Sequence, residues 1–293
     1  MSKTGDSEQL GTAEGAVMSR ALHALHGEAP ILNDTWAVHL LSAEDQRIAR
    51  AGPKKDGYEP PETNRLAPIF AVGVGSLRYA EDAVESALRD FDIRQYVCLG
   101  AGFDTFALRR GDLLDRLSVF EVDHPDVQRL KRERIDQAPE QPQQLPEFVP
   151  ADFERTNLSE ALSKTSFSRT KKSIFSWMNT IPYLTLEATN ATLAEISALS
   201  SAGSRLVLNY PCEVPRSAAQ IELMTHLRSI VDSKLEGFRS SWKPETFTAL
   251  LAANGFHIVD HATEDDLGKL YFQRRRDGFW PGMPTRLITA ETV

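Results

Sequence analysis

YVCLGAGFDTFALRRGDLLDRLSVFEVD, residues Tyr96–Asp123, is the stretch that decides the fold of this 293-residue chain. A short apolar run, Tyr96–Leu99, enters a Gly-Ala-Gly turn, and a second run, Leu117–Val122, carries acids at its far end. Two glycines let the backbone pass close to a ligand, and an acid about 20 residues later accepts hydrogen bonds from ribose hydroxyls. The stretch therefore predicts a nucleotide-type site on a parallel sheet.

A position just after the turn narrows the choice of ligand. The dinucleotide fingerprint has a third small residue three positions after the second glycine, which leaves room for a pyrophosphate. Here that position holds Thr105, which is bulkier and β-branched. A cofactor without a pyrophosphate fits better, and S-adenosylmethionine (SAM) is the obvious one. An NAD(P)-dependent oxidoreductase stays open as an alternative, as does a protein that binds SAM without catalysing a reaction.

The rest of the chain predicts an α/β fold. From residue 95 onward, short apolar runs alternate with helical patterns, which is typical of βαβ units and a mostly parallel sheet with helices on both faces. Apolar residues recur at helical spacing before that point, over residues 12–41 and 66–88. We expect seven strands, near residues 95–99, 117–122, 147–150, 173–178, 204–210, 257–262 and 269–275.

Several segments also carry a family resemblance. VCLGAGFDTFALR (97–109) followed by FEVDHPDVQRLKRE (120–133) resembles the SAM-dependent methyltransferases related to the leucine carboxyl methyltransferases, whose bacterial members include polyketide O-methyltransferases. Further pieces match in the same order: GTAEGAVMSRALHAL (11–25), LNDTWAVHLL (32–41), SLRYAEDAV (76–84), PADF (150–153) and FSWMNTIPYLTLEA (175–188). The resemblance covers about residues 10–275.

The resemblance implies a Rossmann-like class I methyltransferase fold in a single domain, with an N-terminal helical cap over residues 1–92 and a core over 93–275. It implies transfer of a methyl group from SAM to a hydroxyl or carboxylate of a small molecule, such as a polyketide-like or other secondary metabolite. No residue presents itself as a catalytic base, and methyl transfer tolerates this because a sulfonium methyl is already activated. The expected cofactor residues are Arg78, Gly100, Ala101, Gly102, Asp123, Asp152, Phe153, Met178 and Asn179.

One matched position departs from the family pattern. Many relatives carry a glutamate five residues before the tyrosine of the fourth-strand motif, where this chain has Met178. A thioether cannot hydrogen-bond the amino group of SAM as a carboxylate would, although it can pack against the adenosine or the sulfonium. The departure weakens a protein-carboxyl-methyltransferase interpretation more than it weakens SAM binding.

Two of the cofactor assignments, and one neighbouring acid, have a second interpretation. Asp152 beside Phe153 suits adenine, because a carboxylate accepts from the exocyclic amine while the ring stacks, but Asp152 also suits a helix N-cap. Arg78 lies among apolar helix positions, where it either binds the carboxylate of SAM or forms a structural salt bridge. The ribose contact goes to Asp123. Glu121, two residues earlier and therefore on the same side of the strand, is either a further ligand or lies behind it.

The acceptor side is predicted from two tyrosines and one amphipathic segment. Tyr183, in the fourth-strand motif, and Tyr210, at the end of the fifth strand, either orient the substrate or belong to the core. Segment 212–242 either packs on the sheet as a helix or covers the carboxyl ends of the strands as a lid. In the lid interpretation, Met224 and Leu227 face the substrate. The apolar stripe of this segment comprises Ile221, Met224, Leu227, Ile230–Val231 and Leu235.

Composition argues against several classes of partner. A net charge of −8 and a pI near 5.5 disfavour nucleic acid, because phosphate binding needs a concentrated basic surface. Two cysteines, inside or beside predicted strands, suit a reducing cytoplasm rather than a disulfide framework. The first residues lack a signal pattern and no run reaches about 18 apolar residues, so we expect a soluble, cytoplasmic protein without a membrane span.

Other chemistries lack their motifs. The histidine pairs His23/His26 and His257/His261 have no cysteines or convincing carboxylates beside them, so we expect no metal site. No Gly-x-Ser-x-Gly elbow and no phosphate-binding Gly-x-x-x-x-Gly-Lys loop occurs, which removes the hydrolase and NTPase interpretations. The expected partner is a small methyl acceptor, and nothing in the sequence specifies an oligomeric state.

Overall fold

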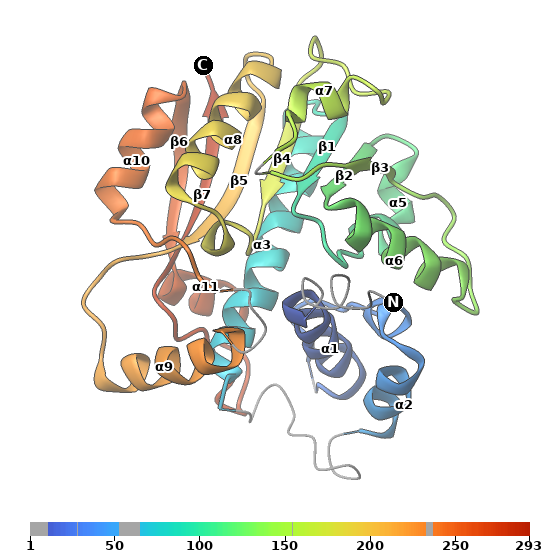
Figure 1. Ribbon diagram of the computed structural model, residues 1–293, viewed down its shortest axis with the longest axis vertical. Helices are drawn as coiled ribbons and strands as arrows, with labels where there is room; N and C mark the ends of the chain where they lie inside the picture. The colour runs from blue at the N-terminus through green and yellow to red at the C-terminus, as the bar shows by residue number, and fades with distance from the viewer. Residues whose placement is uncertain (1–10, 28, 53–64, 154, 233–236) are drawn as a thin grey trace, which may run out of the picture.

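The computed structural model describes residues 11–27, 29–52, 65–153, 155–232 and 237–293. Within these ranges, seven strands form one sheet in the order β3-β2-β1-β4-β5-β7-β6 (Figure 1). β7 is antiparallel to β5 and β6, and the remaining pairs are parallel. The strands are β1 (Gln95–Leu99), β2 (Ser118–Asp123), β3 (Glu147–Pro150), β4 (Ser173–Trp177), β5 (Arg205–Pro211), β6 (Phe256–Thr263) and β7 (Thr285–Thr292). The α/β, mostly parallel prediction is confirmed.

The helices lie on both faces of this sheet and beyond its carboxyl-terminal edge. The α-helices are α1 (Gly11–His26), α2 (Ala43–Ala51), α3 (Ala67–Asp90), α4 (Phe106–Arg109), α5 (Gly111–Leu114), α6 (Pro125–Asp136), α7 (Leu158–Leu162), α8 (Leu186–Leu199), α9 (Ala218–Asp232), α10 (Pro244–Ala253) and α11 (Glu264–Tyr271). Two 3-10 turns add η1 (Ala37–Leu40) and η2 (Ile181–Tyr183). In Figure 1, α1, α2 and α9 all lie at the end of the sheet to which the parallel strands point.

The period-two alternation of β1 divides the core into two layers. Tyr96 and Cys98 face the layer that contains α3, α4, α5 and α11, whereas Val97 and Leu99 face the layer of α7, α8 and α10. All four side chains are at most 7% exposed. Fully burying a large apolar side chain contributes about 1.5–3 kcal/mol, so a strand buried on both faces is a strong anchor for the turn that follows it.

The expected strand at 269–275 is wrong. Residues 264–271 form α11 instead, because Thr263 and Asp266 make a capping box that begins a helix there. The apolar residues that imitated a strand include Phe272, which is buried at the end of α11 in the α3 layer of the core. The seventh strand is β7, in which Leu287, Ile288 and Ala290 are fully buried between β5 and β6.

The N-terminal helices pack over the glycine turn. Val17 and Leu22 of α1 share a buried cluster with Phe103 of the turn and with Leu108 and Ile135. Helix α1 thus rests on the carboxyl-terminal edge of the sheet, whereas α3, which the sequence also assigned to the cap, packs on one face of the sheet. No helix among the described residues is both long and apolar enough to span a bilayer.

Candidate functional site

One large cavity lies at the carboxyl ends of the parallel strands. Its volume is about 1260 Å³. The glycine turn after β1, Asp123 at the end of β2, Ala151 after β3 and Tyr210 in β5 all line it. Further walls come from α1, the first half of α3 and α9. The topology therefore gathers residues from distant parts of the chain around one space, as expected for an open parallel sheet.

The glycine turn has a backbone that other residues rarely adopt. Gly100 has φ +64° and Gly102 has φ +49°, both in the left-handed region. The amides of Gly100 and Ala101 donate to the carbonyl of Val122 at 2.9 and 3.1 Å, which holds the turn against β2. A Cβ on Gly100 would overlap the side chain of Thr180, whereas a Cβ on Gly102 would have no atom of the described residues within 4 Å, apart from its chain neighbours. Gly102 therefore leaves its side-chain volume to the cavity.

Asp123 is tied to the turn by its carboxylate. Oδ2 accepts the amide of Gly102 at 2.5 Å, and Oδ1 accepts the amide of His124 at 2.6 Å. Burial raises the pKa of Asp123, while these two amide hydrogen bonds oppose that shift. Each carboxylate oxygen has two lone pairs, so both can also accept from a ligand in the cavity.

Glu121 faces away from this cavity. It does not line the space, and its carboxylate is paired with Lys131 in a fully buried contact. Burial raises the pKa of Glu121 to about 7, and the Lys131 ammonium opposes this shift. Of the two interpretations for Glu121, the structure supports the one in which it lies behind the ligand-facing acid.

Asp152 and Phe153 both line the cavity next to β3. Asp152 does not cap α7, whose N-cap is Asn157 with a side chain that accepts from the amide of Glu160. The ring of Phe153 lies 6.4 Å from that of Trp177, which supports it from the core side. A carboxylate and an aromatic ring thus stand together at one end of the cavity.

Met178 and Asn179 follow β4 and line the cavity as well. Asn179 has φ +57°, and its amide donates to Oδ1 of Asn209 at 2.6 Å. The side-chain amide of Asn209 donates in return to Oδ1 of Asn179 at 2.8 Å and to Oγ of Ser76 at 3.1 Å. Sequence reasoning missed Asn209, although an amide near the end of an otherwise apolar strand is the signal that could have found it.

The structure does not bring Arg78 into the cavity. Phe70, Gly73, Val74 and Leu77 line it at helical spacing along α3. Arg78 is rotated about 100° from Leu77 around the helix axis, and its guanidinium pairs with Asp82 at 2.7 Å. This is the structural salt bridge that the sequence left as its second interpretation.

Arg20 of α1, unlike Arg78, lies on the cavity wall. It is 8% exposed. Its guanidinium donates to the carbonyl of Phe103 at 2.6 Å and pairs with Asp34 at 3.2 Å. Its Nε–H is buried and, as far as the structure describes the chain, lacks a hydrogen-bond partner. The missed signal is an arginine among the apolar positions of α1, next to Ala21.

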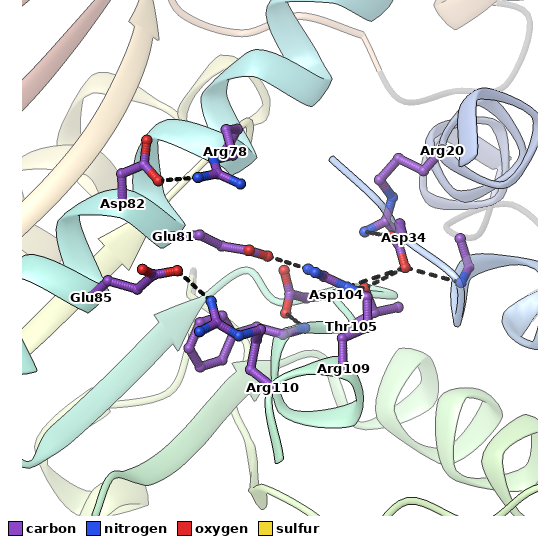
Figure 2. A network of polar contacts seen from close by, with 12 residues as sticks. Arg20, Asp34, Arg78, Glu81, Asp82, Glu85, Asp104, Thr105, Arg109 and Arg110 are labelled. Atoms are coloured by element: carbon purple, nitrogen blue, oxygen red, sulfur yellow. Dashed lines mark hydrogen bonds and ion pairs between the residues drawn. The ribbon is translucent and has the colours of Figure 1, made fainter. Parts of the chain in front are cut away.

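Arg20 belongs to a network that joins the cap to the sheet (Figure 2). Asp34 accepts from the hydroxyl of Thr105 at 2.6 Å and lies 3.4 Å from Nε of Arg109. Arg109 in turn pairs with Glu81 of α3. Thr105, the residue that argued against a dinucleotide, therefore anchors the cap beneath the turn.

A small side chamber of about 30 Å³ adjoins the turn. Glu81, Asp104 and Met178 line it, and Asp104 and Met178 also line the main cavity. Burial raises the pKa of Glu81, and the carboxylate of Asp104 adds to that shift. The Arg109 guanidinium, which is paired with Glu81, opposes this shift, so the chamber places Met178 beside two carboxylates of which one is ion-paired.

The two predicted tyrosines both line the main cavity. Tyr183 contacts the ring of Phe238 at 5.5 Å. Tyr210 is 1% exposed and stacks on Phe247 with ring centroids 4.0 Å apart. Its buried hydroxyl has no hydrogen-bond partner in the described chain, and burial raises the pKa of Tyr210, so the group is a neutral donor at ordinary pH.

Helix α9 covers the outer part of the cavity. Met224 and Leu227 line the space, as expected of a lid. Leu223 is buried against the start of α3 in a cluster with Val72 and Met283, and Met224 packs against the same cluster. Ile221, which the stripe included, is 56% exposed. The side chains of Ile230–Val231 and Leu235 fall outside the described residues.

Comparison with known proteins identifies relatives of this chain. The family model for leucine carboxyl methyltransferase matches residues 13–197. A protein of Bacillus subtilis strain 168, named as a SAM-dependent methyltransferase, is 32% identical over 185 residues, which cover 63% of this chain and 60% of that protein. One from Mycobacterium avium strain 104, named likewise, is 32% identical over 218 residues, or 70% and 69% of the two chains.

A solved structure bears on the fold. The crystal structure described as a methyltransferase from Thermobifida fusca has a TM-score of 0.58 and 15% identity, with 94% of each chain covered. In the part of the chain that the structure describes, no three His, Cys, Asp or Glu residues are placed to hold a metal ion.

Proposed function

Because this chain belongs to the leucine carboxyl methyltransferase family of SAM-dependent methyltransferases, we propose that it transfers the methyl group of SAM to an oxygen atom of a small molecule. The supporting observation is a single cavity of about 1260 Å³ that joins the glycine turn and Asp123 to an apolar region under α9. Ligand pockets commonly measure about 300–1,000 Å³, so this volume accommodates a cofactor together with an acceptor. The acceptor we favour is a polyketide-like or other secondary metabolite.

The polar groups of the cavity favour one orientation of SAM. Asp152 and Phe153 suit the adenine, one as an acceptor for the exocyclic amine and the other as a stacking surface. Asp123 suits the ribose hydroxyls, and Gly102 leaves room for the backbone to approach the sugar. Asn179, held by Asn209, completes this half of the site.

The methionine end of SAM finds both of its charges matched. The guanidinium of Arg20, on the cavity wall, suits the carboxylate, in place of Arg78. The carboxylate of Asp104, with Glu81 behind it, suits the ammonium group that Met178 cannot bind. Arg20 and Arg109 supply two positive charges to this cluster, whereas Asp34, Glu81 and Asp104 supply three negative charges. The ammonium and the carboxylate of SAM add one charge of each sign, so the cluster keeps an excess of one negative charge, which suits the adjacent sulfonium.

The chemistry needs positioning more than a base. SAM, when bound, supplies an electrophilic methyl carbon attached to a sulfonium. The acceptor oxygen forms a bond to that carbon while the carbon–sulfur bond breaks, its electron pair stays on sulfur, and a hydroxyl acceptor releases its proton to water. The protein contributes alignment of the two partners, and such alignment can account for several kcal/mol of the barrier.

Calorimetry with SAM and with NADPH tests the proposal. We expect SAM to bind and NADPH not to bind, followed by transfer of label from methyl-labelled SAM to a metabolite extract. Binding of NADPH without SAM would establish the oxidoreductase instead. Tight SAM binding with no labelled product from any acceptor would leave a non-catalytic SAM-binding protein.

We also propose that the chain acts in the cytoplasm as one domain. Cys98 and Cys212 are both buried and unpaired, which suits a reducing compartment. Strands from residues 95–292 belong to one sheet, and helix α1 of the N-terminal cap is packed on its ligand-binding edge. A single cooperative unfolding transition by calorimetry is the expected result for such a unit.

A further inference from the structure

Helix α3 contains two glycines, Gly73 and Gly75, well inside its length. Glycine weakens a helix relative to alanine, because it loses more backbone freedom on folding and supplies no side chain that packs. Each of the two positions therefore calls for an explanation in terms of what surrounds it.

Gly75 is explained by packing against α11. A Cβ on Gly75 would lie 2.8 Å from Cδ2 of Leu267 and 3.1 Å from Cε2 of Phe272, both of which are buried. A side chain at this position would push α11 away from α3. Glycine here allows the two helices to approach each other closely.

Gly73 is not explained in this way. It is two residues before Gly75 and therefore about 200° away around the helix axis. Apart from its chain neighbours and the backbone of its own helix, no atom of the described residues lies within 4 Å of the position that a Cβ would take. Gly73 lines the main cavity. Its missing side chain therefore adds volume to the cavity instead of allowing a close helix contact.

Contacts on either side place Gly73 between the two halves of the cavity. Ser76, about 4.5 Å farther along the helix axis, accepts from the side-chain amide of Asn209, which lines the cavity in β5. Val72, the residue before Gly73, is buried in a cluster with Leu223 of α9. Gly73 thus lies where the strand ends give way to the region that α9 covers.

The cavity face of α3 has a gap at Gly73. Ile69 lies one turn before it and Leu77 one turn after it, and both line the cavity. Leu77 also lines the side chamber, together with Gly100 and Met178. One edge of the gap is therefore next to the region to which the proposed function assigns the methionine part of SAM.

We propose that Gly73 determines the size of the methyl acceptor, and that the gap admits a ring that carries the reacting oxygen beside the methyl group of SAM. The proposal rests on the proposed function and names the acceptor class of that same site. An unbranched alcohol is narrow enough to bind without this gap. A ring is wider, and it can lie flat against helix backbone that has no side chain.

A SAM analogue with a benzyl group in place of the methyl group tests this volume without any acceptor. Its affinity is compared by calorimetry with that of S-adenosylhomocysteine, and we expect the two to agree within about tenfold for the wild-type protein. Gly73→Leu should weaken the benzyl analogue at least about tenfold and change S-adenosylhomocysteine by less than about threefold. Gly73→Ala should give an intermediate loss for the analogue.

Melting temperatures provide the second measurement, and Gly75→Ala is the matched control. Gly73→Ala should raise the melting temperature by about 1–2 °C, because alanine favours the helix and meets no neighbour. Gly75→Ala should lower it, because the added Cβ overlaps Leu267. The control should also keep the wild-type ratio between the two affinities, since Gly75 does not line the cavity.

Several outcomes would contradict the role of Gly73. A wild-type protein that binds S-adenosylhomocysteine but not the benzyl analogue has no free volume beside the sulfonium. A Gly73→Leu variant that weakens both ligands equally, or neither, does not set acceptor size. A lower melting temperature for Gly73→Ala would show that the position is packed. Failure of the wild-type protein to bind SAM or S-adenosylhomocysteine removes the proposed function itself.

Discussion

The inner and outer halves of the cavity are built in different ways. The inner half consists of strand ends and a turn whose backbone is fixed by hydrogen bonds, such as those from Gly100 and Ala101 to Val122. The outer half is formed by α9 and the start of α3, which meet mainly through apolar contacts such as those of Leu223. Hydrogen-bonded backbone is directional and apolar contact is not. The inner half is therefore suited to one invariant cofactor. The outer half is suited to bind the acceptor and to set the specificity for it.

Replacing a turn glycine should give the largest effect if the inner half is rigid. Gly100→Ala adds a Cβ at positive φ that overlaps Thr180, so we expect a loss of about 2–5 kcal/mol in the free energy of unfolding, measured in denaturant. Gly278→Ala is the control, because its φ is also positive at 78° but the added Cβ would have no non-adjacent atom of the described residues within 4 Å. It should lose only about 1–2 kcal/mol. Equal losses in the free energy of unfolding for the two variants would mean that the glycine turn can shift to accommodate the added Cβ.

The next-largest effect should be on the affinity for the cofactor alone. Asp123→Asn keeps the shape of the side chain but removes its charge, so SAM affinity by calorimetry should fall about ten- to a hundredfold. Asp126→Asn, on the surface of α6 beside Arg129, should leave that affinity unchanged. An Asp123→Asn variant with wild-type affinity would show that the ribose is not bound at this carboxylate.

Substitutions of Arg20 in α1 and Arg78 in α3 test which of these two arginines binds the carboxylate of SAM. Arg20→Gln should weaken SAM about tenfold more than it weakens 5′-methylthioadenosine, which lacks the carboxylate, whereas Arg78→Gln should affect both ligands little. The opposite pattern would show that Arg78, rather than Arg20, binds the carboxylate of SAM. Parallel losses of both ligands in Arg20→Gln would make Arg20 a structural residue of the cap.

The smallest effect on SAM binding should come from a substitution in the outer half of the cavity. Leu227→Asp places a charge on the cavity wall, so methyl transfer should fall at least about tenfold while SAM affinity stays within a few-fold. Ile221→Asp, on the exposed side of the same helix, should preserve both. A large drop in melting temperature for Leu227→Asp would mean that α9 is part of the core rather than a lid.

The two halves also differ in how far the sequence predicts them. The turn, Asp123, Asp152 and Met178 are local to strand ends, so spacing along the chain was enough to place them. Arg20 reaches the cavity because α1 packs over the turn, through a contact between residues 83 positions apart that periodicity does not reveal. β7 was missed for a similar reason, since its position between β5 and β6 is a property of the whole sheet.

The placement of β7 has a consequence for how the chain acquires its structure. In the described sheet, β6 pairs with β7 and with no other strand, and β7 comes later in the sequence than every other strand. During synthesis, β5 and β6 therefore expose open backbone edges until residues 285–292 have been made. Open edges recruit other strands, so a shortened or stalled chain should be especially prone to aggregation and dependent on chaperones.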